Sequence, residues 1–289
     1  MLGRKVVEIL LDSPRYTVYG VEKHKQEVSS PAFTVYGDLT DPAFITSLLT
    51  ESKPAVIIHC AAITDVDLCE RDHGLARTLH VDTTKQLASY APAKFMYIST
   101  DSVFDGQSGG YTESDTPAPQ NYYALTKLEG EQAALSANPQ TTVLRTNIYG
   151  FHYPLGRSLA EWAVSSLKAG EKIHGFTDVF FNPLYTKQLA RIISFFSESN
   201  FHGIIHAASS QNISKYDFIR SIATKLQLSL DLLQPGRLRK ENMSARRPTN
   251  STLNINMMKG LYPNLNDLSL EAGIQEFCID YRSTPKSKL

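Results

Sequence analysis

A threonine, a tyrosine and a lysine occur in an order and spacing suited to carbonyl reduction. Thr100 lies in the segment YISTDSVFDG, and Tyr123 and Lys127 lie in TESDTPAPQNYYALTKLEGE. Hydride transfer to a ketone leaves charge on the carbonyl oxygen, so a site must supply a proton and a hydrogen-bond donor there. Tyr123 could supply the proton, and the Thr100 hydroxyl could hold the oxygen. The chemistry indicated is reduction with a nicotinamide cofactor.

The spacing of Tyr123 and Lys127 favours cooperation between them. The run of Ala, Leu, Glu, Lys and Gln over residues 122–135 predicts a helix, and residues four apart lie on one helical face. A free phenol titrates near 10, and a neighbouring ammonium favours the phenolate. We therefore expect Lys127 to lower the pKa of Tyr123.

The tyrosine–lysine spacing alone is a weak signal. It also occurs at Tyr19 with Lys23 and at Tyr90 with Lys94, which we interpret as accidental. The third pair differs because a buried strand, residues 95–98, runs into Thr100 upstream of it, and ligands of open α/β sheets bind at the carboxyl ends of strands. The alternative is an ordinary surface tyrosine and lysine.

The order of elements predicts an α/β fold, namely a Rossmann-type doubly wound parallel sheet with a smaller C-terminal substrate-binding region. Strand-like runs alternate with helix-like segments, the pattern of a parallel sheet covered on both faces. The expected strands are residues 17–21, 55–59, 94–99, 142–145 and 203–206, and helices are expected at 43–53 and 75–91. Residues 1–150 would form the dinucleotide-binding domain and 151–289 mainly the substrate-binding region, with about 172–206 returning to the sheet.

The beginning of the chain departs from a complete dinucleotide-binding fold. Such folds open with a buried strand and a glycine-rich turn at a helix N-terminus. MLGRKVVEILL resembles the end of that turn, with Gly3 as its last glycine and residues 5–11 as the helix. The first strand and most of the turn, roughly ten residues, would be lacking. Either the recorded start lies downstream of the real one, or the chain is a truncated relative.

Several segments together carry a family resemblance. YISTDSVFDG, YTESDTPAPQNYYALTKLEGE and VLRTNIYG resemble the extended short-chain dehydrogenase/reductases, in particular the dTDP-4-dehydrorhamnose reductase branch. The resemblance covers nearly the whole chain, because further segments follow the same order: GDLTD, HCAAITDVDLCE, NPLYTKQLA, GIIHAASSQNISKYDFIRSIA and ARRPTNSTLN.

The resemblance implies a role for individual residues. The catalytic group would be Thr100, Asp101, Tyr123 and Lys127. The cofactor would contact the last two and also Gly3, Asp38, Leu39, Ala61, Ala62, Ile63 and Thr64. The substrate would contact Arg145 and Arg247. Each has a plainer alternative: the alanines could pack a helix on a sheet, Asp101 could cap a turn, and the arginines could form surface ion pairs.

Two positions depart from the family pattern. His80, in LARTLHVDTT, stands where the family usually has asparagine before valine, and a structural role is the commoner outcome for a lone histidine. The string FHYPLGR, residues 151–157, replaces an asparagine-containing loop expected near the substrate. These departures leave the identity of the substrate open.

The choice between NADPH and NADH stays open. Glu22 follows a predicted strand about twenty residues after the glycine turn, where an acid favours the free ribose hydroxyl of NAD. Lys23, His24 and Lys25 follow directly and could pair with the extra phosphate of NADP, or could form a solvated loop.

The resemblance implies NAD(P)H-dependent reduction of a 4-keto deoxysugar nucleotide, with dTDP-4-dehydrorhamnose as the foremost substrate. One alternative is a non-catalytic dinucleotide-binding subunit similar to the beta subunit of methionine adenosyltransferase. Another is a nucleotide-sugar epimerase, which would keep its cofactor and need no external reductant.

The composition of the chain fits a soluble enzyme. The 289 residues carry 29 basic and 29 acidic side chains, so no basic field invites nucleic acid or an anionic membrane. Neither a signal peptide nor an apolar segment of transmembrane length is seen. Three cysteines without a CxxC pair suit the cytoplasm, and the histidines show no metal-ligand spacing, so no metal is expected. A homodimer is the default assembly.

Overall fold

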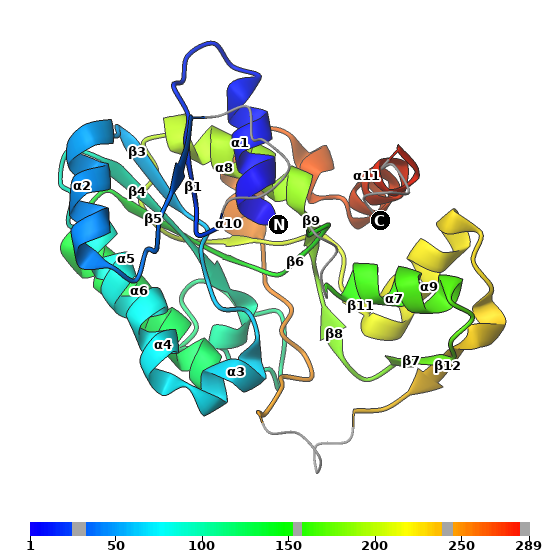
Figure 1. Ribbon diagram of the computed structural model, residues 1–289. Coiled ribbons are helices and arrows are strands. Elements are labelled where there is room, and N and C mark those ends of the chain that lie inside the picture. Colours follow the sequence, from blue (N-terminus) through cyan, green and yellow to red (C-terminus); the bar gives the residue numbers. More distant parts are fainter. Residues whose placement is uncertain (25–32, 153–157, 239–244, 284–289) are drawn as a thin grey trace.

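The computed structural model describes residues 1–24, 33–152, 158–238 and 245–283. Figure 1 shows a larger lobe, built on a parallel sheet, and a smaller lobe formed by later parts of the chain. The larger lobe contains α1 (Leu2–Leu11) near the beginning of the chain and α10 (Asn256–Leu261) near its end. The two lobes are therefore not simple halves of the sequence.

Four parallel strands form the main sheet. Their spatial order is β10-β5-β4-β3, and each strand was predicted from the sequence. All six residues of β5 are buried, which agrees with a strand covered on both faces. The strands are β3 (Val56–His59), β4 (Lys94–Thr100), β5 (Thr141–Thr146) and β10 (Gly203–Ala207).

Two further strands form a separate parallel pair in the described part of the chain. β1 (Tyr19–Glu22) pairs with β2 (Phe33–Tyr36), and neither belongs to the four-stranded sheet. The sequence analysis did not predict β2, because its four residues are exposed or only partly buried and give no core pattern.

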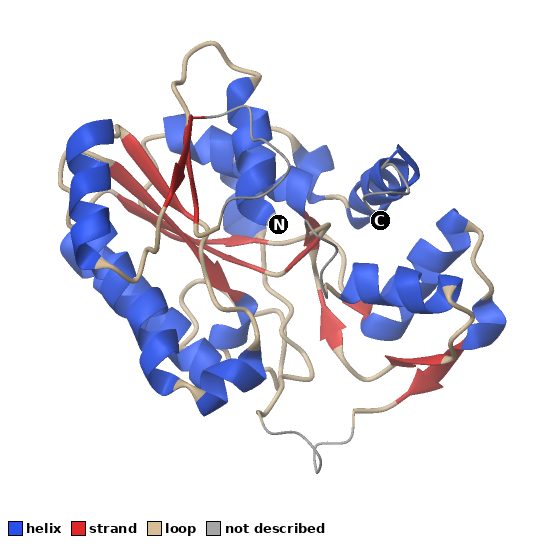
Figure 2. Cartoon of the chain, viewed as in Figure 1, coloured by secondary structure: helices blue, strands red, loops and turns tan. Residues whose placement is uncertain are grey.

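Helices cover both faces of the main sheet (Figure 2). On one face, Leu2 and Val6 of α1 join Leu189 and Ile193 of α8 (Thr186–Glu198) in a core with Met96. The opposite face is covered by α2 (Pro42–Ser52), α5 (Thr83–Ala88) and α6 (Tyr122–Ala137), whose buried residues pack on Phe95 and Val143. This arrangement confirms the predicted α/β fold.

The helix expected at 75–91 is interrupted. α3 (Val66–Arg71) and α4 (His73–Arg77) lead into a π-helical turn at Thr78–Asp82, which continues into α5. Such turns occur mostly as single insertions in α-helices, frequently at functional sites. The turn contains His80, whose side chain is fully buried.

The smaller lobe has its own short sheets. β7 (Ile173–Phe176) pairs with β12 (Leu233–Gly236) beside α7 (Leu159–Lys168) and α9 (Lys215–Leu226). β8 (Phe180–Phe181) pairs with β11 (Ile213–Ser214), and β6 (Ile148–Tyr149) pairs with β9 (Leu184–Tyr185). Short 3-10 turns lie at Asp101–Val103, Leu230–Leu232 and Leu265–Leu268.

The residues over which the chain returns to the larger lobe differ from the expected range of about 172–206. β7 lies in the smaller lobe because it pairs with β12, so the return runs from β9 through α8 to β10. A second return was not predicted. Met258 of α10 and Leu268 are buried in the same core as α1 and α8.

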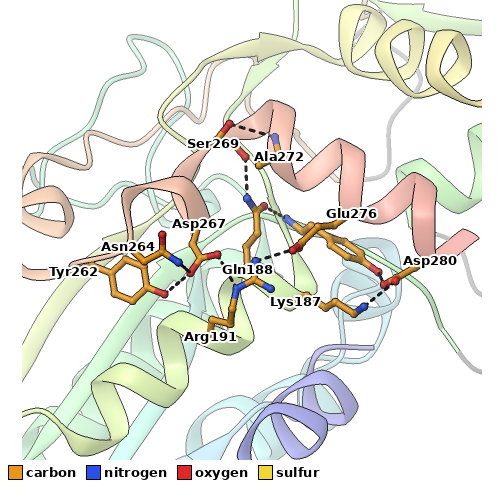
Figure 3. A network of polar contacts seen from close by, with 11 residues as sticks. Lys187, Gln188, Arg191, Tyr262, Asn264, Asp267, Ser269, Ala272, Glu276 and Asp280 are labelled. Atoms are coloured by element: carbon orange, nitrogen blue, oxygen red, sulfur yellow. Dashed lines mark hydrogen bonds and ion pairs between the residues drawn. The ribbon is translucent and has the colours of Figure 1, made fainter. Parts of the chain in front are cut away.

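Polar contacts attach the C-terminal helix α11 (Leu270–Ser283) and the turn before it to α8 (Figure 3). Arg191 donates to Asp267 over 2.6 Å and to Glu276 over 3.1 Å. Lys187 pairs with Asp280 at 2.7 Å. Helix α11 is thus anchored to α8 of the larger lobe. Among the described residues, no helix is both long and apolar enough to cross a membrane.

Candidate active site

Thr100 ends β4 at the carboxyl edge of the sheet. Its hydroxyl accepts from the backbone N–H of Ser102 and donates to Asp101, each over 3.1 Å. These contacts fix the direction of the side chain. Thr100 therefore stands at the strand end where ligands of parallel sheets bind.

Asp101 is buried, and its carboxylate accepts hydrogen bonds from several side chains. Its carboxylate accepts from the hydroxyl of Ser251 at 2.5 Å and from the amide of Asn147 at 2.8 Å, in addition to Thr100 and Ser102. Burial raises the pKa of Asp101, while these four contacts lower it. The family resemblance implies a catalytic role for Asp101. The hydrogen-bonding capacity of the Asp101 carboxylate is satisfied within the protein, so its contacts support a positioning role.

Tyr123 lies in the first turn of α6. The Asn121 side chain caps this helix by accepting from the N–H of Ala124 at 2.9 Å, which fixes where the helix begins. Burial is the largest influence on the Tyr123 phenol and raises its pKa, whereas hydrogen bonding to Thr100 lowers it. The expected lowering by Lys127 is not found, because the influences on the pKa of Tyr123 are burial, Thr100, Asp101 and Cys69. The phenol therefore holds its proton at neutral pH, which a proton donor must do before the reaction.

Lys127 lies one turn further along α6 and is buried. Its ammonium donates to the carbonyl of Ile98 at 2.7 Å and lies 3.9 Å from the centre of the Tyr97 ring. Burial lowers the pKa of Lys127 to about 7, an effect that the charge of Glu131 opposes. An ammonium has three donors, so further N–H groups remain for a ligand.

His80 connects the loop after β3 to α6. Nε2 of His80 accepts from the backbone N–H of Ile63 at 3.0 Å, and Nδ1 lies 2.9 Å from the hydroxyl of Thr126. Because Nε2 accepts, the neutral ring carries its proton on Nδ1 and donates it to Thr126. Burial, with help from Lys127, lowers the pKa of His80 to about 3. The histidine thus has the structural role that the sequence analysis considered commoner.

The residues expected near the cofactor gather at the carboxyl end of β3. Gly3 lies in the first turn of α1, where an added Cβ would lie 3.7 Å from the Cβ of Cys60. The segment Ala61, Ala62, Ile63 and Thr64 follows Cys60 directly, and all four are at least partly accessible. A helix N-terminus beside small, accessible residues fits the pyrophosphate and nicotinamide parts of a dinucleotide.

Asp38 and Leu39 lie at the end of β2, beside the predicted adenine region. Asp38 accepts from the N–H and hydroxyl of Thr40 and pairs with Lys23 at 2.8 Å. Lys23 is the main reason why the pKa of Asp38 lies well below its usual range. The carbonyl of Leu39 accepts from Thr83 at 2.7 Å.

The two groups considered for cofactor choice also lie at the ends of these strands. Glu22 pairs with Arg4 at 3.5 Å, so the acid that would favour NAD already has a basic partner. Of the basic cluster, Lys23 holds Asp38, and Lys25 lies outside the described residues. Acidic and basic side chains thus lie together at these strand ends, and they favour neither NAD nor NADP.

Arg145 does not face the substrate side as the sequence analysis expected. Its guanidinium makes a two-pronged ion pair with Glu131, with distances of 2.7 to 3.2 Å, and both residues are at most 2% exposed. Glu131 also accepts from Ser99. Arg145 points into the interior because β5 is buried on both faces, so we assign it a structural role.

Arg247 lies at the edge of the site, in the segment 245–254. Its guanidinium pairs with Asp67 of α3 at 3.1 Å, with both side chains partly exposed. The close approach of Gly106 to Pro248 holds this segment in place, since an added Cβ on Gly106 would lie 2.0 Å from the Cβ of Pro248. The segment contacts both lobes, because Ser251 donates to Asp101 and Thr249 accepts from the N–H of Phe180 at 2.8 Å.

Sequence reasoning missed several residues that shape the site. Ser251 and Asn147 hold Asp101, and Glu131 holds Arg145. Ser251 and Asn147 lie inside the strings ARRPTNSTLN and VLRTNIYG, so the signal was present, but no spacing rule connects them to Asp101. The other tyrosine–lysine pairs are indeed unsuited to cooperation, because Tyr19 lies in a strand and Lys94 begins one.

A parallel α/β sheet with a threonine, a tyrosine and a buried lysine at its carboxyl edge defines an NAD(P)-dependent oxidoreductase of the short-chain dehydrogenase/reductase type. Within that class, the chain belongs to the family described as RmlD substrate binding domain, which matches residues 1–278.

Individual relatives agree with this assignment. The probable low-salt glycan biosynthesis reductase of Haloferax volcanii is 29% identical, with 96% of each chain covered. The beta subunit of methionine adenosyltransferase 2 from Danio rerio is 31% identical, with 77% of this chain and 71% of the relative covered. The crystal structure of dTDP-4-dehydrorhamnose reductase from Bacillus anthracis in complex with NADP superposes with a TM-score of 0.81 at 25% identity, covering 91% and 98% of the two chains.

Proposed function

We propose that this protein reduces the 4-keto group of a deoxysugar nucleotide, with dTDP-4-dehydrorhamnose as the foremost substrate and NADPH or NADH as the reductant. The placement of Tyr123 and Thr100 together at the carboxyl end of β4 is the observation that carries the proposal. Similarity to a dTDP-4-dehydrorhamnose reductase solved with NADP supports it.

The residues present fit a dinucleotide. The N-terminal turn of α1, with Gly3, would receive the pyrophosphate, and the accessible segment 61–64 would line the nicotinamide side. Asp38 and Leu39 would lie near the adenine, and Lys127 would donate to the ribose. When bound, the nicotinamide supplies the hydride.

The protein's own groups perform the rest of the chemistry. The Thr100 hydroxyl carries a single proton, so on substrate binding it turns that proton from Asp101 to the substrate carbonyl oxygen and orients it. Tyr123 transfers its phenolic proton to that oxygen as negative charge develops there. Asp101 fixes the end of β4 through the side chains of Ser251 and Asn147, and thereby the position of Thr100. The Lys127 ammonium lies one helical turn away and stabilises the phenolate that remains.

The test is NAD(P)H oxidation on addition of dTDP-4-dehydrorhamnose, followed by identification of the sugar product. Oxidation in proportion to the reduced sugar is expected. Tight cofactor binding with no oxidation by any dTDP-keto sugar would contradict the proposal. Interconversion of sugars without net oxidation would instead identify an epimerase.

A second candidate is a non-catalytic regulatory subunit, favoured by the similarity to methionine adenosyltransferase 2 subunit beta. Co-purification with a partner enzyme, together with absence of turnover, would support it. We further propose that the protein works in the cytoplasm as a homodimer. Light scattering of the purified chain measures the assembly, and a monomeric mass would overturn that part.

A further inference from the structure

Glu70 is an acidic residue near the active site to which the mechanism above gives no role. It lies in the last turn of α3, and its carboxylate accepts from the backbone N–H of Tyr122 at 2.7 Å. Tyr122 is the first residue of α6, and the proposed proton donor Tyr123 follows it directly. The carboxylate therefore binds α6 one residue away from the reacting phenol.

The contact satisfies a backbone donor that the helix itself leaves free. The first four N–H groups of an α-helix have no partner within the helix. Glu70 takes up the N–H of Tyr122, and the Asn121 side chain takes up that of Ala124. The residues before and after Tyr123 are thus both fixed. A carboxylate is well suited to this end of a helix, because the helix dipole is positive there and hydrogen bonds to a charged acceptor are strong.

An aromatic contact holds the same residue from α4. The rings of His73 and Tyr122 are stacked, with centroids 3.7 Å apart and planes inclined by 10°. The pair of short helices α3 and α4 therefore binds the beginning of α6 through both the backbone and the ring of Tyr122. A shift of the first turn of α6 would break at least one of these contacts.

Helix α3 is itself tied to the proposed cofactor segment, residues 61–64. The thiol of Cys69 donates to the carbonyl of Ile63 at 3.7 Å, and Glu70 is the next residue along the chain. Glu70 therefore connects the segment proposed to line the nicotinamide with the helix that carries Tyr123.

Reduction needs this connection to be accurate, because hydride and proton must reach one carbonyl group from two different parts of the protein. A misplacement of about 1 Å can lower a rate by about 100-fold. We propose that Glu70 is a positioning residue for the reduction. It fixes the first turn of α6 to α3 and thereby holds the phenol of Tyr123 in register with the nicotinamide. This inference rests on the proposed function, because that function supplies the reaction that Tyr123 serves.

The experiment measures kcat, KM for the keto sugar and NADPH affinity in the wild type and in variants at Glu70. Glu70→Ala removes the acceptor and should lower kcat by about 10- to 100-fold, with NADPH affinity retained. Glu70→Gln keeps an accepting oxygen within reach and should retain most of the activity. Glu70→Asp keeps the charge but is one methylene shorter, so its kcat should lie between those of the other two variants.

Glu129 provides the matched control. It lies further along α6 and pairs with Arg77 of α4 at 2.5 Å, with the Arg77 and Glu129 side chains 51% and 33% exposed. Glu129→Ala thus removes another acidic contact of α6 with the same pair of short helices and should leave kcat unchanged. An equal fall of kcat in Glu129→Ala and Glu70→Ala would assign the effect to helix packing and overturn the positioning role.

Combination with Tyr123→Phe distinguishes positioning from general destabilisation. If Glu70 acts through the phenol, adding Glu70→Ala should not lower the residual turnover of Tyr123→Phe further. A further fall as large as that in the single variant would overturn the role. Should Glu70→Ala fold poorly, the other two variants decide, because higher activity in Glu70→Asp than in Glu70→Gln would show that charge matters and not reach.

The outcomes separate this role from the proposed reaction. Wild-type turnover of the keto sugar together with an unaffected kcat in Glu70→Ala would overturn the positioning role and leave the proposed function standing. Absence of turnover by the wild-type chain would contradict the proposed function and, with it, the role of Glu70.

Discussion

The backbone N–H of Ile63 donates to Nε2 of His80 over 3.0 Å, so a buried imidazole joins the loop after β3 to the helix of the active site. Its other nitrogen reaches Thr126, one residue before Lys127. The ring stays neutral at physiological pH because burial lowers its pKa to about 3. One side chain thereby sets the distance between the proposed cofactor loop and the proposed proton donor.

His80→Leu should therefore loosen both sides of this connection. The N–H of Ile63 would lose its acceptor in a buried place, which costs about 1–3 kcal/mol of folding stability. We also expect weaker NADPH binding, with partial recovery in His80→Asn. Urea unfolding and cofactor titration measure the two effects. Wild-type values in His80→Leu for both quantities would contradict the positioning role.

Tyr123→Phe should keep the fold and the affinity for NADPH but lower turnover by at least about 100-fold, the usual scale for loss of a general acid. The ring and its contact with His80 are retained in this variant, so only the hydroxyl group is removed. Steady-state kinetics and a cofactor titration provide the comparison. Turnover close to wild type would show that another group donates the proton.

Gly130→Ala should destabilise the protein. An added Cβ at Gly130 would lie 2.3 Å from the carbonyl oxygen of His80 and 2.4 Å from the Tyr97 hydroxyl, so α6 would have to move away. Overpacking of this kind costs about 1–3 kcal/mol. Gly260→Ala is the matched control, because it is also helical and has nothing within 4 Å of the added atom. Equal thermal stability of the two variants would refute the close approach.

Arg145→Met should reduce stability by about 3–5 kcal/mol, because it leaves the buried Glu131 carboxylate without its cation. The double variant that combines Arg145→Met with Glu131→Leu should recover much of the lost stability. dTDP affinity of the folded double variant should match wild type, since Arg145 does not face the substrate. A selective loss of dTDP affinity would restore the substrate role for Arg145.

Cofactor affinity should depend on the protonation of Lys127. The pKa of this group is about 7 in the folded chain, against an ordinary value of 10.5. Its ammonium is therefore present below about pH 7 and lost as the pH rises, so NADPH binding should weaken above pH 7. One proton allows at most about a tenfold change per pH unit. Titrations between pH 6 and 9 should show this slope in the wild type and a flatter profile in Lys127→Met.

Sequence patterns predicted the strands of the main sheet because buried parallel strands are continuous apolar runs. They missed β2, whose residues Phe33 and Tyr36 are exposed. The contacts of the site were harder to predict, since they depend on where long-range neighbours lie. Nothing in the string VLRTNIYG shows that Arg145 meets Glu131, and nothing local shows that Ser251 meets Asp101.

The contact between Ser251 and Asp101 joins positions 150 residues apart in the chain. Contacts with such long sequence separation form late, because closing the intervening loop costs entropy before the contact repays it. During synthesis, Asp101 emerges long before Ser251 can satisfy its carboxylate. The strand end that carries Thr100 can therefore reach its final form only when almost the whole polypeptide has been made, which delays the onset of activity to the last stage of folding.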